Sequence, residues 1–558
     1  MGKKRPDKPA KDKETAAKQP AKDGLRETIE SVAIAFILAF LFRTFEAEAF
    51  VIPTGSMAPT LMGRHKDLVC KNCRFPYRVS ASAEEREGQS AKREVVSSVC
   101  PQCRYEMRFG PTGPDADEPH ASYRGDRIIV AKYPYEFSEP QRWDVAVFKN
   151  PNQAKQNYIK RLVGLPNETL VICKGDVFTS RDGLRGDEWR ASDVNEMQRA
   201  GQLAIERKPP EKVQAMLQTV HDNNYQAPRM PARWWPDRAE DDHWTRINDD
   251  KGLEHDGQGG ESWYSYRHLV PTPDDWRKLR RQRKQTTEDL EIDAELITDF
   301  YGYNTGETEP PELPPHHDHW VGDLAIECRL AIDGTKGEAL LALVEGGCFF
   351  ECRVDVETGM AKLSISDDPA FERTVQTGIR GPGRYRVQFA NIDDQLLLWV
   401  GGKPLEFDGR FGPLTNDVPT ADDLRPVRLG SNGAAMRFTD LRVRRDVYYI
   451  ASRQSRDQNL PSSLSAPETW KDFVFDNAPA IGFRLDADQF LMLGDNSPQS
   501  ADSRSWQGVD ERGHTEHYVR RDLLIGKAVF IYWPHGVRVF SDWWFPFYPN
   551  FPRMGLVR

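Results

Sequence analysis

The sequence predicts a mainly β protein built from antiparallel strands, with few helices. Apolar side chains occupy every second position in residues 324–332, 385–389 and 396–400, and this alternation is typical of strands with one buried face. Two C-x-x-C pairs, at 70–73 and 100–103, indicate a small hairpin unit that binds a metal. Only residues 31–42 are apolar enough to enter a bilayer, which excludes a polytopic membrane protein.

Length and composition narrow the class further. A chain of 558 residues, at roughly 150 residues per domain, predicts three or four structural units. The 76 basic and 85 acidic side chains give a net charge of −9, which argues against general binding of nucleic acid. Eight cysteines are too few for a disulfide scaffold of this length, so each cysteine cluster is interpreted from its own spacing.

The N-terminal segment predicts a basic disordered tail over residues 1–27 and a membrane anchor helix over residues 28–48. The apolar part, 31–42, spans roughly 18 Å as a helix, short of a hydrocarbon core of about 30 Å. By length alone it could instead be a cleavable signal segment or a buried helix. As an anchor it would keep the basic tail in the cytoplasm and place the rest of the chain outside.

A candidate nucleophile follows directly, in the segment FVIPTGSMAPTL at residues 50–61. Pro53 and Gly55 indicate an extended approach into a turn that displays Ser56. Serine is a weak nucleophile unless a base lies within hydrogen-bond reach. The twelve histidines offer no convincing triad, so the base has to be a residue of another type.

Lys160 is the candidate base, in the strand-like run NYIKRLVGLP at residues 157–166. A lysine of ordinary pKa is neutral in roughly one molecule in a few thousand at pH 7. Burial among apolar neighbours disfavours the ammonium and lowers the pKa by several units. The alternative is an ordinary strand lysine with its amine in water.

A third segment, FLMLGDNSPQSADSR at residues 490–504, begins as an apolar strand and continues through a Gly-Asp-Asn turn. Its polar loop carries Ser500, Asp502 and Arg504. A hydrophilic surface loop would have a similar composition.

Together these segments resemble type I signal peptidase, the membrane-bound Ser/Lys endopeptidase that removes signal peptides. The resemblance includes the order of the motifs, from a short anchor through GSMAPTL (55–61), RGDRIIV (124–130) and YIKRLVGLP (158–166) to the 494–504 loop. It implies an antiparallel β core over residues 49–69, 104–186 and 468–558. It also implies an exposed apolar rim at the bilayer. The C-terminal aromatic residues are candidates for this rim, although they could equally pack against the domain as a terminal arm: Trp543, Trp544, Phe545, Phe547, Tyr548 and Phe551.

The resemblance assigns roles residue by residue. Ser56 would be the nucleophile and Lys160 the general base, with Ser500 orienting the lysine amine. The backbone N–H of Ser56 and the hydroxyl of Thr54 would form the oxyanion hole. Supporting positions around this site would be Asp495, Asp502 and Arg504.

The implied reaction is cleavage after a small residue of a secretory pre-protein, without a metal or organic cofactor. The implied location is the cytoplasmic (inner) membrane, crossed once, with the N-terminus cytoplasmic and the catalytic domain extracytoplasmic. Signal peptides and the lipid bilayer would be the partners. One departure concerns the third motif, where the family commonly has Gly-Asp-Asn-Arg-Asp-Asn-Ser and this chain has Gly-Asp-Asn-Ser-Pro-Gln-Ser, a change expected to loosen the loop.

Residues 70–103 predict a zinc-ribbon-like insertion. Two C-x-x-C pairs separated by 26 residues have the spacing of a ribbon with four thiolates around one structural Zn²⁺: Cys70, Cys73, Cys100 and Cys103. An extracytoplasmic location would also permit disulfides here.

The second insertion separates Lys160 from the 494–504 loop. Residues 187–230 predict a helical or linker segment with a helix at Lys212–Asp222, and residues 231–450 predict a jelly-roll β-sandwich. The segments GGKP at 401–404 and 427–443 resemble the concanavalin-like, laminin-G-type fold. Such a domain could bind a glycan or protein ligand or be a passive insertion; Trp263, Tyr264 and Trp399 could stack on a sugar, although core packing is favoured.

Two smaller patterns have competing interpretations. The run Pro314–Trp320, rich in His and Pro, could bind a metal but is more typical of a solvated linker. Cys348 and Cys352 could bridge each other or remain buried free thiols, and Cys173 and Cys328 have no ligand spacing.

Three functions remain to be compared: an active signal peptidase, a receptor that binds glycan or protein through the sandwich on an inactive peptidase scaffold, and a soluble Ser/Lys autoprotease. The complete set of Ser56, Lys160, Ser500 and Thr54 favours the first over the second. The basic tail and apolar segment argue against the third.

Overall fold

The computed structural model confirms the mainly β class. Its sheets, described below, consist of antiparallel strand pairs. The residues it describes are 2, 24–41, 47–85, 94–109, 121–181, 183–184, 186–239, 241–281, 291–308, 319–452, 470, 478–506, 508–509, 515–536 and 548–558.

Two sheets form a unit that we call the split unit, because its strands come from both ends of the chain. The larger sheet has the order β1 (Ala47–Val51), β6 (Arg127–Ala131), β34 (Leu524–Trp533), β7 (Val145–Asn150), β8 (Gln153–Gly164), β30 (Gln489–Leu493) and β33 (Val519–Arg520), with β35 (Gly555–Leu556) paired to β34. The smaller has the order β11 (Glu188–Arg190), β29 (Pro479–Arg484), β9 (Thr169–Cys173), β10 (Asp176–Ser180) and β12 (Ala204–Ile205). The pairing of β8 with β30 places two segments side by side that are more than 300 residues apart in the sequence.

Short elements complete this unit: α2 (Pro134–Phe137), α3 (Ala191–Arg199), β31 (Gly508–Val509) and β32 (Thr515–Glu516). Apolar side chains pack on both faces of the larger sheet, with Val145 and Val147 on one face and Ala146 and Phe148 on the other. This burial on both faces explains the nearly continuous apolar run of β7.

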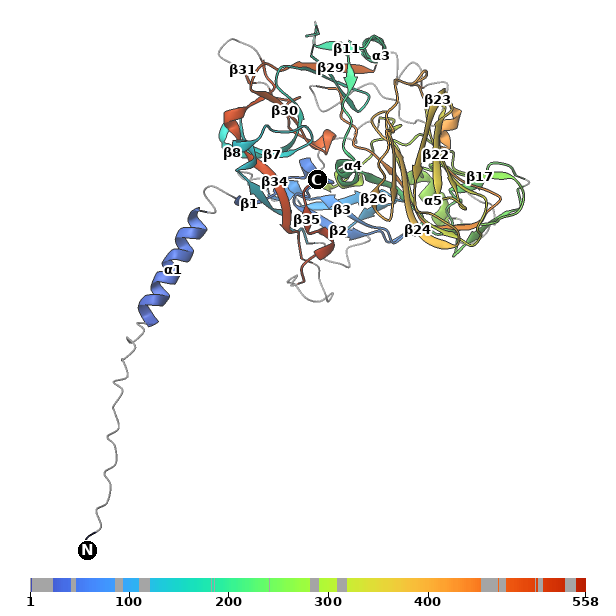
Figure 1. Ribbon diagram of the computed structural model, residues 1–558, viewed down its shortest axis with the longest axis horizontal. Coiled ribbons are helices and arrows are strands. Elements are labelled where there is room, and N and C mark those ends of the chain that lie inside the picture. Colours follow the sequence, from blue (N-terminus) through green and yellow to red (C-terminus); the bar gives the residue numbers. More distant parts are fainter. Residues whose placement is uncertain are drawn as a thin grey trace.

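The insertion between β10 and β29 contains two sheets with a large apolar core between them (Figure 1). One has the order β15 (Trp244–Ile247), β16 (Gly252–Asp256), β28 (Ala435–Arg445), β19 (Leu324–Ile332), β24 (Gly383–Asn391), β25 (Leu396–Val400) and β26 (Lys403–Pro404). The other has the order β14 (Trp234–Pro236), β17 (Glu261–Tyr266), β27 (Val427–Asn432), β20 (Glu338–Glu345), β21 (Cys348–Asp355), β22 (Met360–Ile365) and β23 (Asp368–Gln376). We call this pair the sandwich.

The aromatic residues considered for sugar stacking lie in the interior. Trp263, Tyr264 and Trp399 are all buried, as core packing requires. Cys348 and Cys352 are buried free thiols in the described structure.

The helix expected at Lys212–Asp222 is wrong in its second half. The helix α4 covers Pro210–Met216, and the chain then forms β13 (Gln218–Asp222), which pairs with β28 of the sandwich. Tertiary pairing with the edge of an existing sheet outweighs the weak local helix preference of this stretch.

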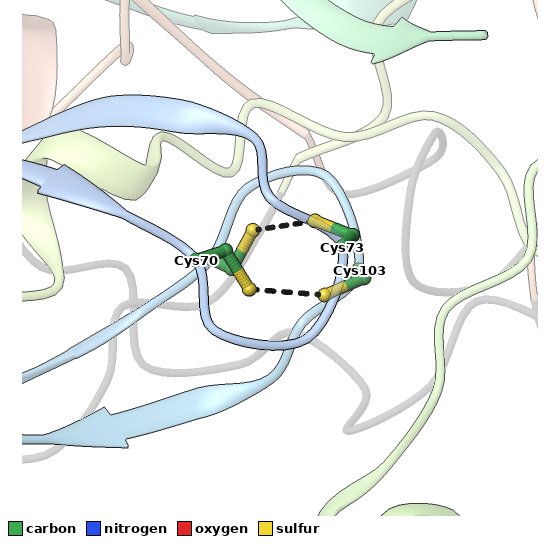
Figure 2. Close-up of side chains that lie close together, drawn as sticks. Cys70, Cys73 and Cys103 are labelled. Atoms are coloured by element: carbon green, nitrogen blue, oxygen red, sulfur yellow. Dashed lines mark hydrogen bonds between the residues drawn. The ribbon is translucent and has the colours of Figure 1, made fainter. Parts of the chain in front are cut away.

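The two C-x-x-C pairs lie in the turns of two hairpins, β2 (His65–Val69) with β3 (Pro76–Ser80) and β4 (Val95–Val99) with β5 (Glu106–Arg108). Figure 2 shows the cysteines meeting where the two turns face each other. A third strand, β18 (Glu307–Thr308), pairs with β4. Because β18 belongs to the long insertion, the hairpin unit and the insertion share a sheet.

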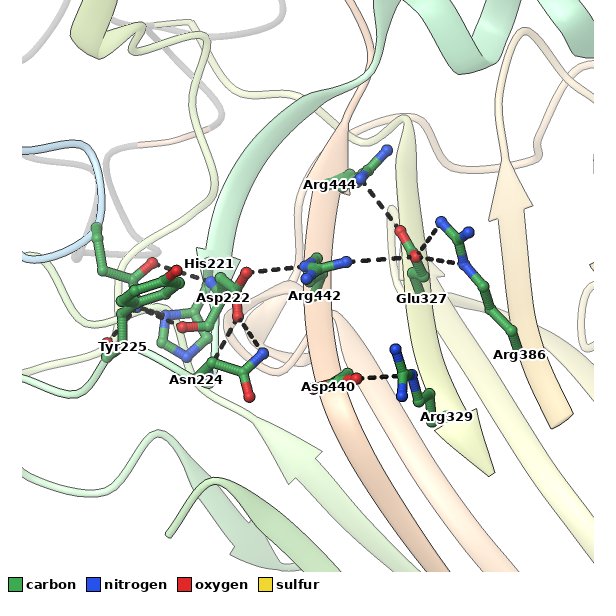
Figure 3. A network of polar contacts seen from close by, with 11 residues as sticks. His221, Asp222, Asn224, Tyr225, Glu327, Arg329, Arg386, Asp440, Arg442 and Arg444 are labelled. Carbon is green, nitrogen blue, oxygen red and sulfur yellow. Dashed lines mark hydrogen bonds and ion pairs between the residues drawn. The ribbon is translucent and has the colours of Figure 1, made fainter. Parts of the chain in front are cut away.

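A polar network fastens these hairpins to the sandwich (Figure 3). The side chain of Gln102 donates to the backbone oxygen of Asp222 at 2.9 Å and accepts from its backbone N–H at 2.9 Å. The carboxylate of Asp222 accepts from Arg442 at 2.8 Å, and Arg442 and Arg444 also lie beside the buried Glu327. This charge-assisted chain runs from the second cysteine turn across β13 and β28 to β19.

The N-terminal helix α1 covers Gly24–Leu41 and extends away from the rest of the molecule (Figure 1). Five of its described apolar side chains are half-exposed or more: Ile29, Val32, Ile34, Phe36 and Ile37. Within the part of the chain that the structure describes, no helix combines the length and the apolarity needed to span a bilayer.

Some predicted features lie wholly or largely outside the described residues. They are most of the basic tail at 1–27, the His-rich part of 314–320, and the aromatic residues at 543–547. Of the proposed apolar rim, Tyr548 and Phe551 are described, and both are more than half exposed. The remaining helix, α5, covers Pro273–Arg281 and packs Trp276 against the hairpin unit.

Candidate active site

Ser56 lies in a tight turn that the chain makes directly after β1. The turn is a single 3₁₀ segment, Gly55–Met57, and all three of its residues are buried. A Cβ at Gly55 would lie 2.4 Å from the ring of Tyr303, and one at Gly63 would lie 2.1 Å from the backbone of Thr54. Both positions therefore need glycine for the close packing that holds the turn.

Lys160 lies on β8, and its amine meets the serine. The Nζ atom of Lys160 lies 2.5 Å from the Oγ atom of Ser56. Lys160 is buried, with 4% of its surface exposed. Burial lowers the pKa of Lys160 from 10.5 to about 8, although the carboxylates of Asp502 and Asp495 act in the opposite direction. At that pKa roughly one molecule in ten carries a neutral amine at pH 7.

Asp495 is held by the residue that follows the lysine. Arg161 is fully buried and forms a bidentate pair with Asp495, at 2.7 Å from Nε to Oδ1 and 2.6 Å from Nη2 to Oδ2. Thr60, from the serine turn, donates to the same carboxylate at 2.5 Å. One buried ion pair thus joins the serine turn, β8 and the 494–504 loop.

Asp502 and Arg504 form a second buried pair. Arg504 donates to both carboxylate oxygens of Asp502, at 2.8 and 2.7 Å, and also to the carbonyl oxygen of Ser497 at 2.9 Å. The positive charge of Arg504 holds the pKa of Asp502 below its ordinary value, despite burial, which acts the other way. Both carboxylates nearest the lysine therefore have their own arginine.

In the Ser-Pro-Gln segment, where this chain differs from the family motif, the Ser497 side chain forms two hydrogen bonds. Ser497 is buried, and its Oγ accepts from the backbone N–H of Ile450 at 2.8 Å and from Arg504 at 2.6 Å. Through these contacts Ser497 joins the loop to Ile450, in the segment that follows β28.

Two predicted residues lie at the site without making the predicted contacts. The Oγ of Ser500 is buried and has no hydrogen-bond partner among the described residues; a Cβ at Gly494 would lie 2.2 Å from it and 2.5 Å from the carbonyl oxygen of Ser56. The hydroxyl of Thr54 is exposed and does not cap the 3₁₀ segment. It is therefore not committed to another intramolecular role there.

Sequence reasoning missed three residues that brace the serine turn. Asn496 donates from its backbone N–H to the carbonyl oxygen of Ser56 and from its side chain to that of Gly55, both at 3.0 Å. Asn304, from the insertion, exchanges side-chain hydrogen bonds with Asn496 at 2.7 and 2.8 Å, and Tyr303 packs on Gly55. The Gly-Asp-Asn turn signalled Asn496, but no local pattern places residues 303 and 304 here.

The four predicted zinc ligands come together in the hairpin unit. All four sulfurs are buried and within 4.8 Å of one another, with Cys70 to Cys103 and Cys73 to Cys100 both at 3.7 Å. A disulfide would require about 2.05 Å, whereas four sulfurs bonded tetrahedrally to Zn²⁺ at about 2.3 Å lie about 3.8 Å apart. The donor set therefore fits a closed structural zinc site better than disulfides.

A family match covers most strands of the split unit and the two ends of the insertion. Residues 117–226 and 433–533 match the family model described as signal peptidase, peptidase S26. Signal peptidase I of Leptolyngbya laminosa is 28% identical over 177 residues, which cover 30% of this chain and 57% of that protein. The probable signal peptidase I-1 of Synechocystis sp. is 25% identical over 166 residues, covering 28% of this chain and 53% of that protein.

The chain thus spans just over half the length of these curated relatives. The matched ranges contain Lys160 and the 494–504 loop, while Ser56 precedes them. Among solved structures, the carbohydrate-binding module CBM66 from Bacillus subtilis covers 38% of this chain and 95% of its own, at 10% identity and a TM-score of 0.22, which is too low to assign a fold or a ligand. The family and sequence matches support a serine endopeptidase of the signal peptidase type.

Proposed function

We propose that this protein is a membrane-anchored serine endopeptidase that removes signal peptides from secretory pre-proteins with a dyad of Ser56 and Lys160. The observation that carries the proposal is the buried 2.5 Å contact between Lys160 Nζ and Ser56 Oγ. The family match supports the substrate class.

In this reaction the neutral amine of Lys160 takes the hydroxyl proton as Ser56 Oγ attacks the scissile carbonyl. Collapse of the tetrahedral intermediate breaks the C–N bond, and the lysine ammonium returns the proton to the leaving amine. A water molecule then attacks the acyl-serine, again with Lys160 as base, and releases the signal peptide. The lowered pKa of Lys160 supplies the neutral amine that the first step needs.

Charge on the tetrahedral oxygen would be met by the Ser56 N–H and the uncommitted hydroxyl of Thr54. Removing one such donor typically lowers kcat by about 10²–10³-fold. Ser500 would hydrogen-bond the lysine amine once substrate occupies the site; its buried, unpartnered Oγ supports that role. Two ion pairs would hold the 494–504 loop in place: Asp495 with Arg161, and Asp502 with Arg504.

Anchoring is part of the proposal. The half-exposed apolar side chains of α1 and the basic residues before it support a single-pass anchor in the cytoplasmic membrane, with the catalytic unit outside. Protease accessibility of the catalytic unit in intact spheroplasts, compared with lysed ones, tests this orientation. Protection in intact spheroplasts would contradict it.

The hairpin unit would hold one structural Zn²⁺ through Cys70, Cys73, Cys100 and Cys103. Because the 3.7 Å spacing already fits, purified protein should contain about one zinc per chain. Cys70→Ser together with Cys73→Ser should lose that zinc and lower the unfolding temperature. A Cys173→Ser variant, at a buried cysteine outside the cluster, is the control and should keep the metal.

The activity test uses a purified pre-protein in detergent with wild type, Ser56→Ala and Lys160→Ala. Wild type should cut once after a small residue, as sequencing of the new N-terminus will show, and both variants should be inactive while folded. Lys149→Ala, an exposed lysine on the neighbouring strand β7, should cut normally. Cutting by Ser56→Ala at the wild-type rate would overturn the dyad. A wild type that is folded but cuts no pre-protein would favour the receptor interpretation of the sandwich.

A further inference from the structure

A largely buried acidic cluster lies where the sandwich meets the split unit. Three carboxylates, those of Asp176, Asp323 and Asp393, present oxygen atoms within 4.8 Å of one another. Asp176 begins β10 of the split unit, whereas the other two lie in the sandwich, before β19 and between β24 and β25. No two of these residues are close in the sequence, so the cluster exists only through the packing of the two units.

Asp446, the first residue after β28, lies next to these three carboxylates, and its charge acts on Asp323. Its backbone N–H donates to the carbonyl oxygen of Asp323 at 3.0 Å. Its carboxylate faces Lys208, at 2.8 Å from Oδ2 to Nζ, and Lys208 also pairs with Asp393. The side chain is 1% exposed, and its Oδ1 has no hydrogen-bond partner among the described residues.

The charges in this cluster do not balance. The four carboxylates of Asp176, Asp323, Asp393 and Asp446 lie together with one ammonium, that of Lys208, which pairs with Asp393 and Asp446. If all four are ionised, three formal negative charges remain. Burial raises the pKa of Asp176, Asp323 and Asp446, and their mutual repulsion adds to it. Burial also raises the pKa of two neighbouring carboxylates, those of Glu345 and Asp394.

A neutral oxygen donor lies beside Glu345, whose charge acts on Asp323. Asn391 directs its Nδ2 to Glu345 Oε2 at 2.7 Å, and its Oδ1 is buried without a donor among the described residues. Carboxylate and amide oxygens without sulfur or imidazole are the ligand set of a hard divalent cation, and flexible buried sets of this kind suit Ca²⁺ better than the rigid octahedron of Mg²⁺. Asp176 and Asp323 are partly exposed, so an ion has a route into the cluster.

We propose that Asp176, Asp323, Asp393 and Asp446 bind one Ca²⁺, which fastens the sandwich to the split unit. A bound Ca²⁺ reduces the formal charge of the cluster from −3 to −1 and gives Asp446 Oδ1 a partner. This proposal does not depend on the peptidase activity.

A bound ion at this cluster would also affect the 494–504 loop of the candidate active site. From Asp446 the chain runs to Tyr449, whose N–H donates to the carbonyl oxygen of Gly175 at 3.1 Å, and to Ile450, which contacts Ser497 and Arg504 of the 494–504 loop. The ion would therefore fix the segment 446–450, which leads from the sandwich to the loop beside Lys160.

The test uses the full chain after treatment with EGTA and restoration of zinc to one equivalent, so that loss of metal from the cysteines does not enter the comparison. Equilibrium dialysis against CaCl₂ should give one bound calcium per chain, and the unfolding temperature should rise by about 3 °C or more at saturation. MgCl₂ at the same concentration should bind at least tenfold more weakly. Saturation by Mg²⁺ alone, or less than half an equivalent of bound calcium at 5 mM CaCl₂, would overturn the proposal.

Two variants locate the site. Asp323→Asn and Asp393→Asn should each weaken calcium binding at least tenfold and lose the thermal shift, whereas Asp368→Asn, at an exposed position on β23, should bind like wild type. Without metal, Asp323→Asn relieves repulsion and should unfold at the same temperature as wild type or higher. Stabilisation of this variant with no calcium binding by wild type would mean that the carboxylates share protons instead.

A spectroscopic readout keeps the result independent of folding stability. Lys208 Nζ lies 5.1 Å from the ring centre of Trp143, so Tb³⁺ bound in the cluster should give indole-sensitised emission. Excess CaCl₂ should quench that emission, and Asp393→Asn should abolish it while Asp368→Asn retains it. Equal emission from all the variants would place the lanthanide elsewhere and contradict the assignment.

Discussion

Lys160 and Lys208 are both buried lysines, yet their surroundings give them opposite properties. Near Lys160, Arg161 neutralises Asp495 and Arg504 neutralises Asp502, so burial dominates and lowers the pKa of the lysine to about 8. Around Lys208, burial also acts to lower the pKa, but Asp393, Asp446 and Asp176 outweigh it and raise the pKa well above its ordinary value.

The difference shows that burial alone does not make a lysine a base. A nearby carboxylate keeps a lysine protonated unless another cation occupies that carboxylate first. Each arginine beside the dyad therefore has a chemical effect in addition to a structural one. Lys208, by contrast, is a counter-ion that cannot give up its proton near neutral pH.

The largest expected effect comes from Lys160→Met. Removing the base should reduce kcat by about 10³-fold or more, in line with the loss of a member of a catalytic unit. The same variant should be more stable than wild type at pH 7 by about 2–3 kcal/mol, because the buried ammonium is no longer desolvated. Pre-protein cleavage and urea unfolding measure the two effects, and an inactive variant that is also much less stable would contradict this explanation.

The stability gain of Lys160→Met should depend on pH. The folded pKa of Lys160 is lower than the unfolded one, so the unfolded chain binds more protons between about pH 8 and 10.5, and wild type gains stability relative to the variant as pH rises through that window. Lys149→Met, at an exposed position, should show no such trend.

Lys208→Met should have the opposite effect on stability. It leaves several buried carboxylates without their cation and should destabilise the protein by about 3–5 kcal/mol in calcium-free buffer. Because Lys208 does not contact the serine, the kcat of the folded fraction should stay within about threefold of wild type. Urea unfolding and active-site titration provide both numbers. A stable Lys208→Met variant would remove the contrast between the two lysines.

A smaller effect should follow from Asp502→Asn. The substitution removes the carboxylate that most raises the pKa of Lys160 and leaves the Arg504 charge uncompensated beside the lysine. The acidic limb of the pH–rate profile should therefore move to lower pH, by roughly one unit. Asp522→Asn, an exposed partner of Arg520, should leave the profile unchanged. A shift to higher pH in Asp502→Asn would contradict the electrostatic account.

The sequence contained most of what places Ser56 beside Lys160, because the two motifs are local and each has a recognisable chemistry. The mainly β class could also be predicted, since alternation along 324–332 and 396–400 is a property of the strands themselves. The arginine partner of Asp495 was less visible. Arg161 stands next to the lysine in the motif, but which carboxylate it meets depends on the pairing of β8 with β30.

Contacts that cross between units could not be predicted from local patterns. Tyr303 and Asn304 reach the serine turn from a stretch assigned to the sandwich, and β13 forms where a helix was expected. In each case the partner is hundreds of residues away, so only tertiary packing determines the outcome. The four aspartates around Lys208 are the same kind of feature.

The most direct test of the central claim is the pH dependence of kcat/KM for wild-type cleavage of a purified pre-protein in detergent. This quantity reports ionisations of the free enzyme. Because the neutral form of Lys160 is the active one, kcat/KM should rise tenfold per pH unit at low pH and level off with a midpoint near pH 8. A flat profile, or a rise that continues to about pH 10.5, would contradict a buried lysine base.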